Sequence, residues 1–208
     1  MTTNIAVFKN QLKKTLILSA FAIASSITAF AQNGTFEKKA YDGAYCAISF
    51  QRSGNQVKAQ IFAWWNSTNA QTGYYNGAGV LKNNTAVLHS DENEPGCKVT
   101  LSVFQDKVKA SFANCGTDHL TDAFNGLYTK ITDGVAGDYV VTTPKVYFYK
   151  TPDTSKKRKT YVLKGDKVTL DMDRIAASKK NWLYVYFINK TGKETVGFLP
   201  MSQLKRIE

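Results

Sequence analysis

Residues 97–114 read CKVTLSVFQDKVKASFAN, and this stretch decides the fold class of the chain. On both sides of Gln105-Asp106, apolar residues alternate with polar ones, which is the period of a strand with one buried face. A two-residue turn at Gln105-Asp106 places Val103 opposite Val108 and makes every inward-facing pair apolar. A slip of one residue would expose the whole apolar set, so the pattern predicts an antiparallel hairpin in this register.

The same register predicts a disulfide. It places Cys97 opposite Asn114, and a small bulge would bring the sulfur of Cys97 to that of Cys115. Cys46 would then be the unpaired cysteine. A bond from Cys46 to either of the other two is the alternative, because connectivity cannot be deduced from sequence alone.

Strand patterns continue through residues 32–135. Tyr45–Phe50 and Val57–Trp65 alternate on either side of Ser53-Gly54-Asn55, which predicts a second hairpin. Asn76-Gly77 and Asn83-Asn84 are expected to be turns between shorter strands. The remaining predicted strands are Gly73–Tyr75, Gly79–Leu81, Ala86–His89 and Phe124–Ile131. We therefore expect residues 32–135 to form an antiparallel β-sheet or barrel domain, whose family the sequence does not reveal.

The spacing changes after a short linker at Asp133-Gly134 and Ala136-Gly137. Residues 136–208 hold five short strand patterns separated by polar turns, which is typical of a small β-barrel. A basic loop over Ser155–Lys159 is expected between the first two. The five predicted strands are Lys145–Lys150, Tyr161–Leu163, Val168–Met172, Trp182–Ile188 and Val196–Leu199. The chain as a whole is predicted to be all-β with two domains, 32–135 and 136–208.

Residues 137–207 resemble the bacterial SH3 domain family. Four motifs carry the resemblance, in the order in which that family has them: Leu163-Lys164-Gly165-Asp166-Lys167-Val168, Trp182-Leu183-Tyr184-Val185, Lys190-Thr191-Gly192-Lys193 and Val196-Gly197-Phe198-Leu199. The resemblance implies a small SH3-like β-barrel that binds a ligand, commonly peptidoglycan or another cell-wall component. Phe198 stands where the family usually has Trp, and the usual opening of the family is replaced by Lys145–Tyr149.

Residues 1–31 have the features of a secretory signal peptide. Three lysines precede an uncharged, mostly apolar run from Thr15 to Phe30, and Ala29-Phe30-Ala31 supplies a small-x-small cleavage signal. The run is shorter than the roughly 20 apolar residues of a spanning helix. We expect cleavage after Ala31 and an exported product, periplasmic or secreted, that does not span a membrane.

Charge is unevenly distributed between the two predicted domains. Residues 32–135 hold 9 basic and 9 acidic side chains, whereas residues 136–208 hold 15 basic and 7 acidic ones. The excess in the second domain indicates either an anionic partner or a solubilising surface. Export argues against a nucleic-acid partner.

The second predicted domain also concentrates aromatic residues beside its lysines, a combination that would suit an anionic glycan, peptide or headgroup. We expect Tyr147, Tyr149, Tyr184 and Tyr186 to belong to its core. The candidate ligand contacts are Phe148, Lys156, Lys157, Arg158, Lys159, Trp182 and Phe198.

The sequence offers little for catalysis. A cysteine peptidase needs a thiolate activated by a histidine, and Cys46 would be the only candidate nucleophile. It lies inside a strand pattern, and neither His89 nor His119 belongs to a recognisable motif. No second ligand pair accompanies Cys115 and His119, so no metal site is expected, and no cofactor motif occurs.

Two interpretations of function follow. The first is an exported, non-catalytic cell-envelope protein whose SH3-like domain binds a cell-wall polymer. The second is a periplasmic inhibitor or immunity protein that binds a protein partner. The observation behind it is the acidic Asp91–Glu94 loop in the neutral first domain. A cysteine-type wall hydrolase ranks third. Trp64-Trp65 is expected to divide, with one ring in the core and the other covering an interface or a ligand.

Overall fold

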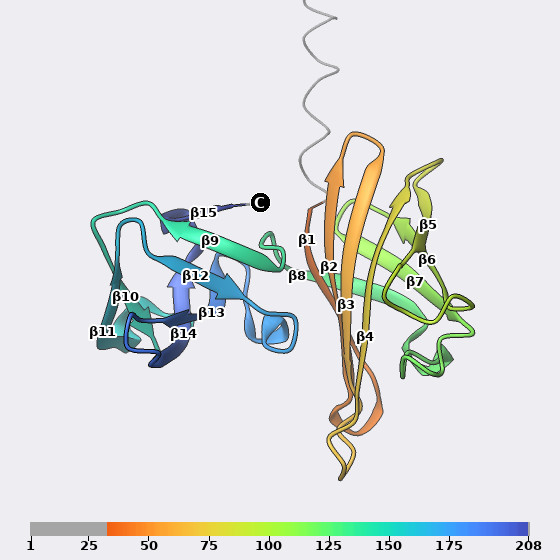
Figure 1. Cartoon of the computed structure of the whole chain (residues 1–208), viewed down its shortest axis with the longest axis horizontal. Coiled ribbons are helices and arrows are strands. Elements are labelled where there is room, and N and C mark those ends of the chain that lie inside the picture. The colour runs from red at the N-terminus through yellow and green to blue at the C-terminus, as the bar shows by residue number, and fades with distance from the viewer. Residues whose placement is uncertain (1–32, 208) are drawn as a thin grey trace, which may run out of the picture. The chain divides into compact units, whose positions relative to one another are not determined.

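The computed structural model describes residues 33–207, so the predicted signal peptide lies outside the described residues. The fold is all-β, as predicted, and comprises a closed antiparallel barrel of strands β1–β8 and a second, seven-stranded sheet of β9–β15 (Figure 1). Both sheets belong to one compact unit. Within residues 33–207, no helix is long and apolar enough to cross a membrane.

The barrel is built from eight strands that pair in chain order. Antiparallel pairing of β8 with β1 closes the ring. A closed ring leaves no strand edge open to another chain. The strands are β1 (Gly34–Lys39), β2 (Tyr45–Ser53), β3 (Gln56–Trp64), β4 (Thr72–Val80), β5 (Thr85–His89), β6 (Lys98–Val103), β7 (Lys107–Ala113) and β8 (Gly126–Thr132).

Both hairpins predicted from alternation are confirmed, and β6–β7 has the predicted register. In β6–β7, Val103 pairs with Val108, and their side chains are buried. In β2–β3, Ile48 pairs with Ile61, and the connecting turn contains Gly54 at φ 60°. Burial of one face therefore fixes the register, because a slip would move these side chains into solvent.

The turn predicted at Asn76-Gly77 is wrong, because β4 runs through both residues. A Cβ on Gly77 would lie 2.5 Å from Cε1 of Tyr75, so the glycine makes room for that ring rather than for a turn. The turn predicted at Asn83-Asn84 does occur, with both residues at positive φ. Such left-handed positions favour asparagine.

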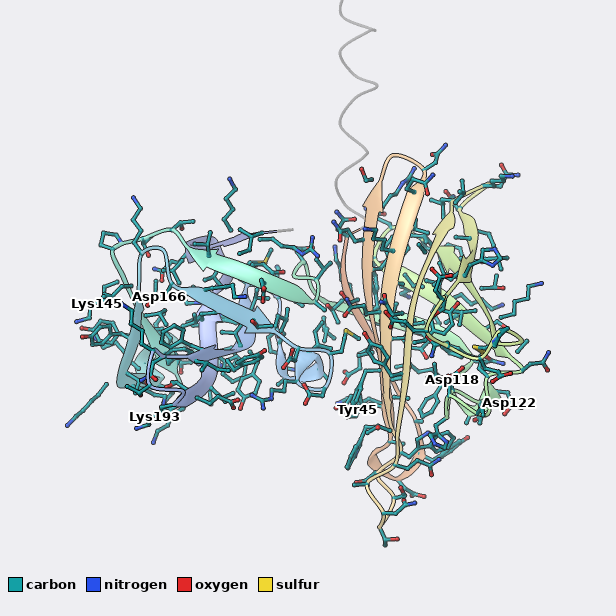
Figure 2. All side chains as sticks on the ribbon, viewed as in Figure 1. Tyr45, Asp118, Asp122, Lys145, Asp166 and Lys193 are labelled. Carbon is teal, nitrogen blue, oxygen red and sulfur yellow. A yellow bond between two sulfur atoms is a disulfide. The ribbon has the colours of Figure 1, made fainter. Side chains whose placement is uncertain are left out.

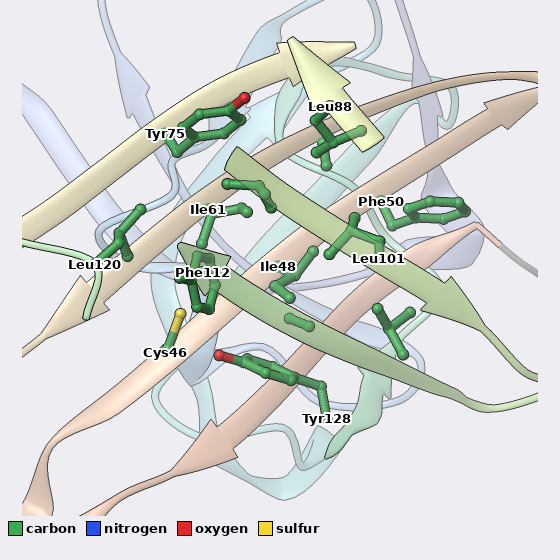
Figure 3. Packing of buried hydrophobic residues seen from close by; sticks show 14 of the residues in the cluster. Cys46, Ile48, Phe50, Ile61, Tyr75, Leu88, Leu101, Phe112, Leu120 and Tyr128 are labelled. Carbon is green, nitrogen blue, oxygen red and sulfur yellow. The ribbon is translucent and has the colours of Figure 1, made fainter. Parts of the chain in front are cut away.

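The interior of the barrel is filled by side chains from its strands. Figure 3 shows Ile48, Phe50, Ile61 and Leu101 packed together, and all of them are buried. Tyr128 is also fully buried, and its hydroxyl donates a hydrogen bond to the carbonyl oxygen of Phe124 at 2.7 Å. The buried phenol is thus satisfied within the protein, as buried polar groups generally are.

The second sheet has the strand order β11-β10-β14-β13-β12-β9-β15, with β11 and β15 at its edges. Its strands are β9 (Gly137–Val141), β10 (Lys145–Tyr149), β11 (Lys157–Leu163), β12 (Lys167–Leu170), β13 (Trp182–Ile188), β14 (Glu194–Pro200) and β15 (Leu204–Arg206). The short 3-10 turns are η1 (Tyr41–Gly43), η2 (Asp122–Phe124), η3 (Thr154–Lys156), η4 (Ile175–Ala177) and η5 (Met201–Gln203).

Two predictions for this region need correction. The expected basic loop Ser155–Lys159 is a loop only in its first half, because β11 begins at Lys157 and pairs with β10. The region also has two strands more than the five predicted. They are β9 and β15, which pair with each other, while β9 also pairs with β12. Both are short and lack a clear alternation of apolar residues.

The segment expected to be a linker is instead packed. Gly134, Val135 and Ala136 are all buried between the last barrel strand and β9. The Thr35 hydroxyl donates to the carbonyl oxygen of Gly134 at 2.7 Å, and the amide of Ala136 donates to Ser49 Oγ at 2.7 Å. These bonds satisfy backbone groups that burial removes from water.

Trp64 and Trp65 pack against different clusters, but both are half-buried, so the expectation of one ring in the core is met only in part. Trp65 packs against the barrel core, with its ring 4.7 Å from that of Phe124 and its Nε1 donating to His119 O at 2.8 Å. Trp64, on the outer face of the barrel, packs against the core cluster of the second sheet. That cluster includes Phe62 from the same outer face.

Candidate ligand-binding face

Strand alternation in β10 decides which of its aromatic residues can reach a ligand. Val146 and Phe148 point to the core, and Phe148 has 0% of its surface exposed. The prediction of Phe148 as a ligand contact is therefore corrected. Tyr147 and Tyr149, expected in the core, are only half-buried and lie on the opposite, outer face.

Six neighbouring aromatic rings on this outer face, across β11, β10, β14 and β13, form what we call the aromatic face. They are Tyr147, Tyr149, Tyr161, Trp182, Tyr184 and Phe198. Tyr186, also expected in the core, is half-buried and points to the same side of β13. Strand pairing sets Tyr147 opposite Tyr161, and Phe198 opposite both Tyr149 and Tyr184.

The rings of the aromatic face hold one another in place. The centroids of Tyr149 and Trp182 lie 4.9 Å apart in an edge-to-face arrangement. The centroids of Tyr184 and Phe198 are also 4.9 Å apart. Such ring pairs are mutually attractive and restrict side-chain motion. A ligand would therefore meet a surface that is already ordered.

Two lysines lie over the rings at one end of this face. Lys145 Nζ is 3.9 Å from the ring centroid of Tyr161 and 5.0 Å from that of Tyr147. Lys157 Nζ lies 4.6 Å from the Tyr147 centroid. Ring faces attract ammonium groups without cancelling their charge. In residues 33–207 neither lysine forms an ion pair with a carboxylate, so both charges stay available to an anion.

The other predicted contacts take different positions. Lys156 lies in η3 and Lys159 in β11, and both are exposed. Arg158 is half-buried, and its Nη1 donates to the carbonyl oxygen of Val196 at 2.5 Å. The guanidinium thus links β11 to β14. This bond occupies one of its donors and gives the arginine a structural role.

The two predicted aromatic contacts in β13 and β14 do lie on the aromatic face. Trp182 is half-buried, with its ring against Tyr149. Phe198 is only 9% exposed, because neighbouring rings cover it. Trp182 therefore offers a ligand more surface than Phe198 does.

Sequence reasoning missed several members of this face, namely Tyr147, Tyr149, Tyr161, Tyr184 and Lys145. Alternation around Phe148 could have identified the first two, since the neighbours of a core residue in a strand point outward. The position of Lys145 over Tyr161 depends on pairing between β10 and β11, which the local sequence does not encode.

Cys46 is not placed for catalysis. Its side chain is fully buried inside the barrel, and burial raises the pKa of its thiol to about 12. The reactive form of cysteine is the thiolate, which is scarce at neutral pH for such a thiol. His119 Nδ1 is engaged elsewhere, 2.7 Å from the side-chain amide of Gln71.

The predicted disulfide between Cys97 and Cys115 is present, and Cys46 is the free cysteine. The connection needs no bulge in the strand. Instead, Asn114 adopts a left-handed conformation, with φ 59°, just beyond the end of β7. Asparagine tolerates this conformation better than most residues.

Acidic residues near both cysteines of the disulfide form an acidic end of the barrel. Asn93, in the predicted acidic loop, donates from Nδ2 to Asp118 Oδ1 at 3.0 Å and to the carbonyl oxygen of Tyr74 at 2.7 Å. Figure 2 labels Asp118. Asp91, Glu92 and Glu94 are exposed around Asn93. We call these three residues, together with Asp118, the acidic end.

Among residues 33–207, no three histidine, cysteine or acidic side chains are grouped so that they could hold a metal ion. Comparison with protein families, with characterised proteins and with solved structures finds no significant match to this chain.

Proposed function

We propose that the protein is an exported, non-catalytic binding protein of the cell envelope, whose second sheet holds a cell-wall polymer on the aromatic face. The observation that carries this proposal is the set of six ordered rings beside two lysines that have no carboxylate partner within residues 33–207. The signal-peptide features of residues 1–31 and the resemblance to bacterial SH3 domains support the same role.

The chemistry of the face suits a glycan with acidic groups. Tyrosine and tryptophan combine an apolar ring with a polar atom, and can therefore contact both the carbon face and the hydroxyls of a sugar. Lys145 and Lys157 supply positive charge at one end. Arg174, near Tyr186, contributes less, because Glu194 binds it at 2.9 Å.

A sedimentation assay with purified peptidoglycan tests the proposal. Protein purified from cells that express the whole chain is expected to pellet with the polymer at low salt. Trp182→Ala and Tyr149→Ala each remove one ring of a contacting pair, and should weaken retention roughly tenfold, about 1.4 kcal/mol.

The matched control for these variants is Tyr41→Ala. Tyr41 lies in η1 beside the barrel, and is 92% exposed. Its loss should leave retention unchanged. Circular dichroism confirms that each variant is folded. Failure of the unmodified protein to pellet at low salt, or equal retention of all variants, would refute the proposal.

The acidic end motivates a second candidate function, an inhibitor or immunity protein that binds a cationic protein. The loop that carries the exposed carboxylates of Asp91, Glu92 and Glu94 is held by Asn93, whose side chain bonds Tyr74 O and Asp118. Pre-ordered charge of one sign favours fast association with a partner of the opposite sign. A stoichiometric cationic protein that co-purifies from the periplasm would favour this function.

A further inference from the structure

A cavity of about 450 Å³ lies beside the outer face of β2, β3 and β4, away from the aromatic face. Amide and hydroxyl side chains make up most of its wall. Its lining residues are Ser49, Gln51, Ser53, Gln56, Lys58, Ala59, Gln60, Asn76, Val135, Ala136 and Arg206. Its volume lies within the range of roughly 300–1,000 Å³ usual for small-molecule sites.

Strand pairing brings these polar groups together. Gln51 pairs with Lys58, and Gln60 pairs with Ser49 on one side and Asn76 on the other. Paired residues on one face of a sheet have neighbouring side chains. The wall is therefore a regular array fixed by the barrel, rather than a chance meeting of mobile loops.

The amides of this array are unused by the fold. Within the part of the chain that the structure describes, the side chains of Gln51, Gln56 and Gln60 form no hydrogen bond. Each amide offers two donors and an acceptor. A vicinal pair of sugar hydroxyls, which also donate and accept, matches this wall.

Arg206 adds a donor that has no partner. Its Nη2 donates to the carbonyl oxygen of Ala136 at 3.3 Å, but its Nε is buried and makes no hydrogen bond among residues 33–207. A buried N–H without an acceptor is costly, and such groups are rare in native proteins. Arg206 also lines the cavity, so an acceptor bound there would lie beside its guanidinium.

The charge of the wall indicates the sign of the ligand. Lys58 and Arg206 line the cavity, and among residues 33–207 no aspartate or glutamate does. No aromatic ring from the described part of the chain lines it either, so the recognition proposed here uses hydrogen bonds and charge. A carboxylate is a group that guanidinium binds through two parallel hydrogen bonds.

We propose that this cavity is a second binding site, for a sugar unit that carries a carboxylate. The sugar hydroxyls bind the amides of Gln51, Gln56 and Gln60, and the carboxylate binds Arg206 and Lys58. This site is independent of the aromatic face, since the two share no residue.

The test is an NMR titration of the purified, ¹⁵N-labelled protein with glucuronate, and with glucose as its neutral counterpart. Glucuronate should shift the amide signals of β2, β3 and β4, and should bind at least about tenfold more tightly than glucose, because one charged hydrogen bond is gained. Gln60→Ala and Arg206→Gln should each weaken glucuronate binding about tenfold.

Gln105→Ala is the matched control, since Gln105 lies in the exposed turn between β6 and β7. Arg206 also contacts the chain at Ala136, so Lys58→Gln provides a second charge variant that leaves that contact intact. Shifts that are absent with glucuronate, or equal affinities for glucose and glucuronate, would overturn the proposal. So would an unchanged affinity in Gln60→Ala and Lys58→Gln.

Discussion

At the scale of single residues, Cys46 shows how burial sets chemistry. The thiol is enclosed by the barrel core and lies near the phenol of Tyr128 (Figure 3). Burial is the larger influence and raises its pKa from 9.0 to about 12. The pKa of Tyr128 is raised as well, mainly by burial. Both groups are therefore neutral in the folded protein at physiological pH.

This shift predicts alkaline destabilisation. The unfolded chain ionises Cys46 near pH 9, whereas the folded protein keeps it neutral up to about pH 12. The stability contributed by the neutral thiol is fully present below pH 9, and is lost as the pH rises toward 12. At pH 10 the loss should be about 1.4 kcal/mol.

The measurement is urea unfolding of the protein and of Cys46→Ala, at pH 7.5 and pH 10. Unfolding is followed within seconds, before disulfides exchange. The variant should lose less stability than the unmodified protein between the two pH values, by about 1.4 kcal/mol. Equal losses in both would show that the thiol is not shielded in the folded state.

At the scale of the elements, β4 depends on its glycines. A Cβ on Gly77 would meet Tyr75 Cε1 at 2.5 Å and the carbonyl oxygen of His89 at 2.9 Å. Tyr75 is itself buried in the barrel, and so has little room to move aside. Gly77→Ala should therefore destabilise the protein by about 2 kcal/mol through overpacking.

The neighbouring residue supplies a control for that prediction. Ala78 is exposed on the opposite face of β4, so Ala78→Ser should change the free energy of unfolding by less than about 0.5 kcal/mol. Urea unfolding monitored by circular dichroism measures both variants. If Gly77→Ala were as stable as the unmodified protein, the tight contact with Tyr75 would not exist in solution.

Strand pairing could be predicted from the sequence only where the two strands lie close together along the chain. The β6–β7 register follows from local alternation around Gln105-Asp106, and the structure has it. Pairing of β8 with β1 joins segments about a hundred residues apart, and no local pattern encodes it. Asn76-Gly77 shows the same limit, because a local turn signal is overridden by the ring of Tyr75.

The candidate site could likewise be predicted only in part from the sequence. Trp182 and Lys157 were predicted as contacts from composition and charge alone, and both lie on the outer face. The prediction of Phe148 as a ligand contact was wrong, because composition does not say which face of a strand a ring occupies. Tyr161 and Lys145 meet only because β10 pairs with β11.

At the scale of the whole molecule, charge is divided between the two sheets. The acidic end of the barrel carries exposed carboxylates, and the lysines beside the aromatic face form no ion pair with any carboxylate of residues 33–207. Interactions between exposed charges are screened within about 8 Å at physiological ionic strength. Each surface should therefore select its own partner.

This division predicts opposite responses to two sets of charge changes. If a wall polymer binds at the aromatic face, retention on peptidoglycan should fall as salt is raised, since exposed charges are screened. Lys145→Gln combined with Lys157→Gln should weaken it about tenfold at low salt, because two charged contacts are removed. Asp91→Asn combined with Glu92→Gln should leave it unchanged or slightly stronger, because these changes remove negative charge elsewhere.

The opposite pattern, with retention insensitive to the lysines, would assign binding to another surface. Loss of a co-purifying cationic protein in the acidic-end variant alone would make the barrel the functional part.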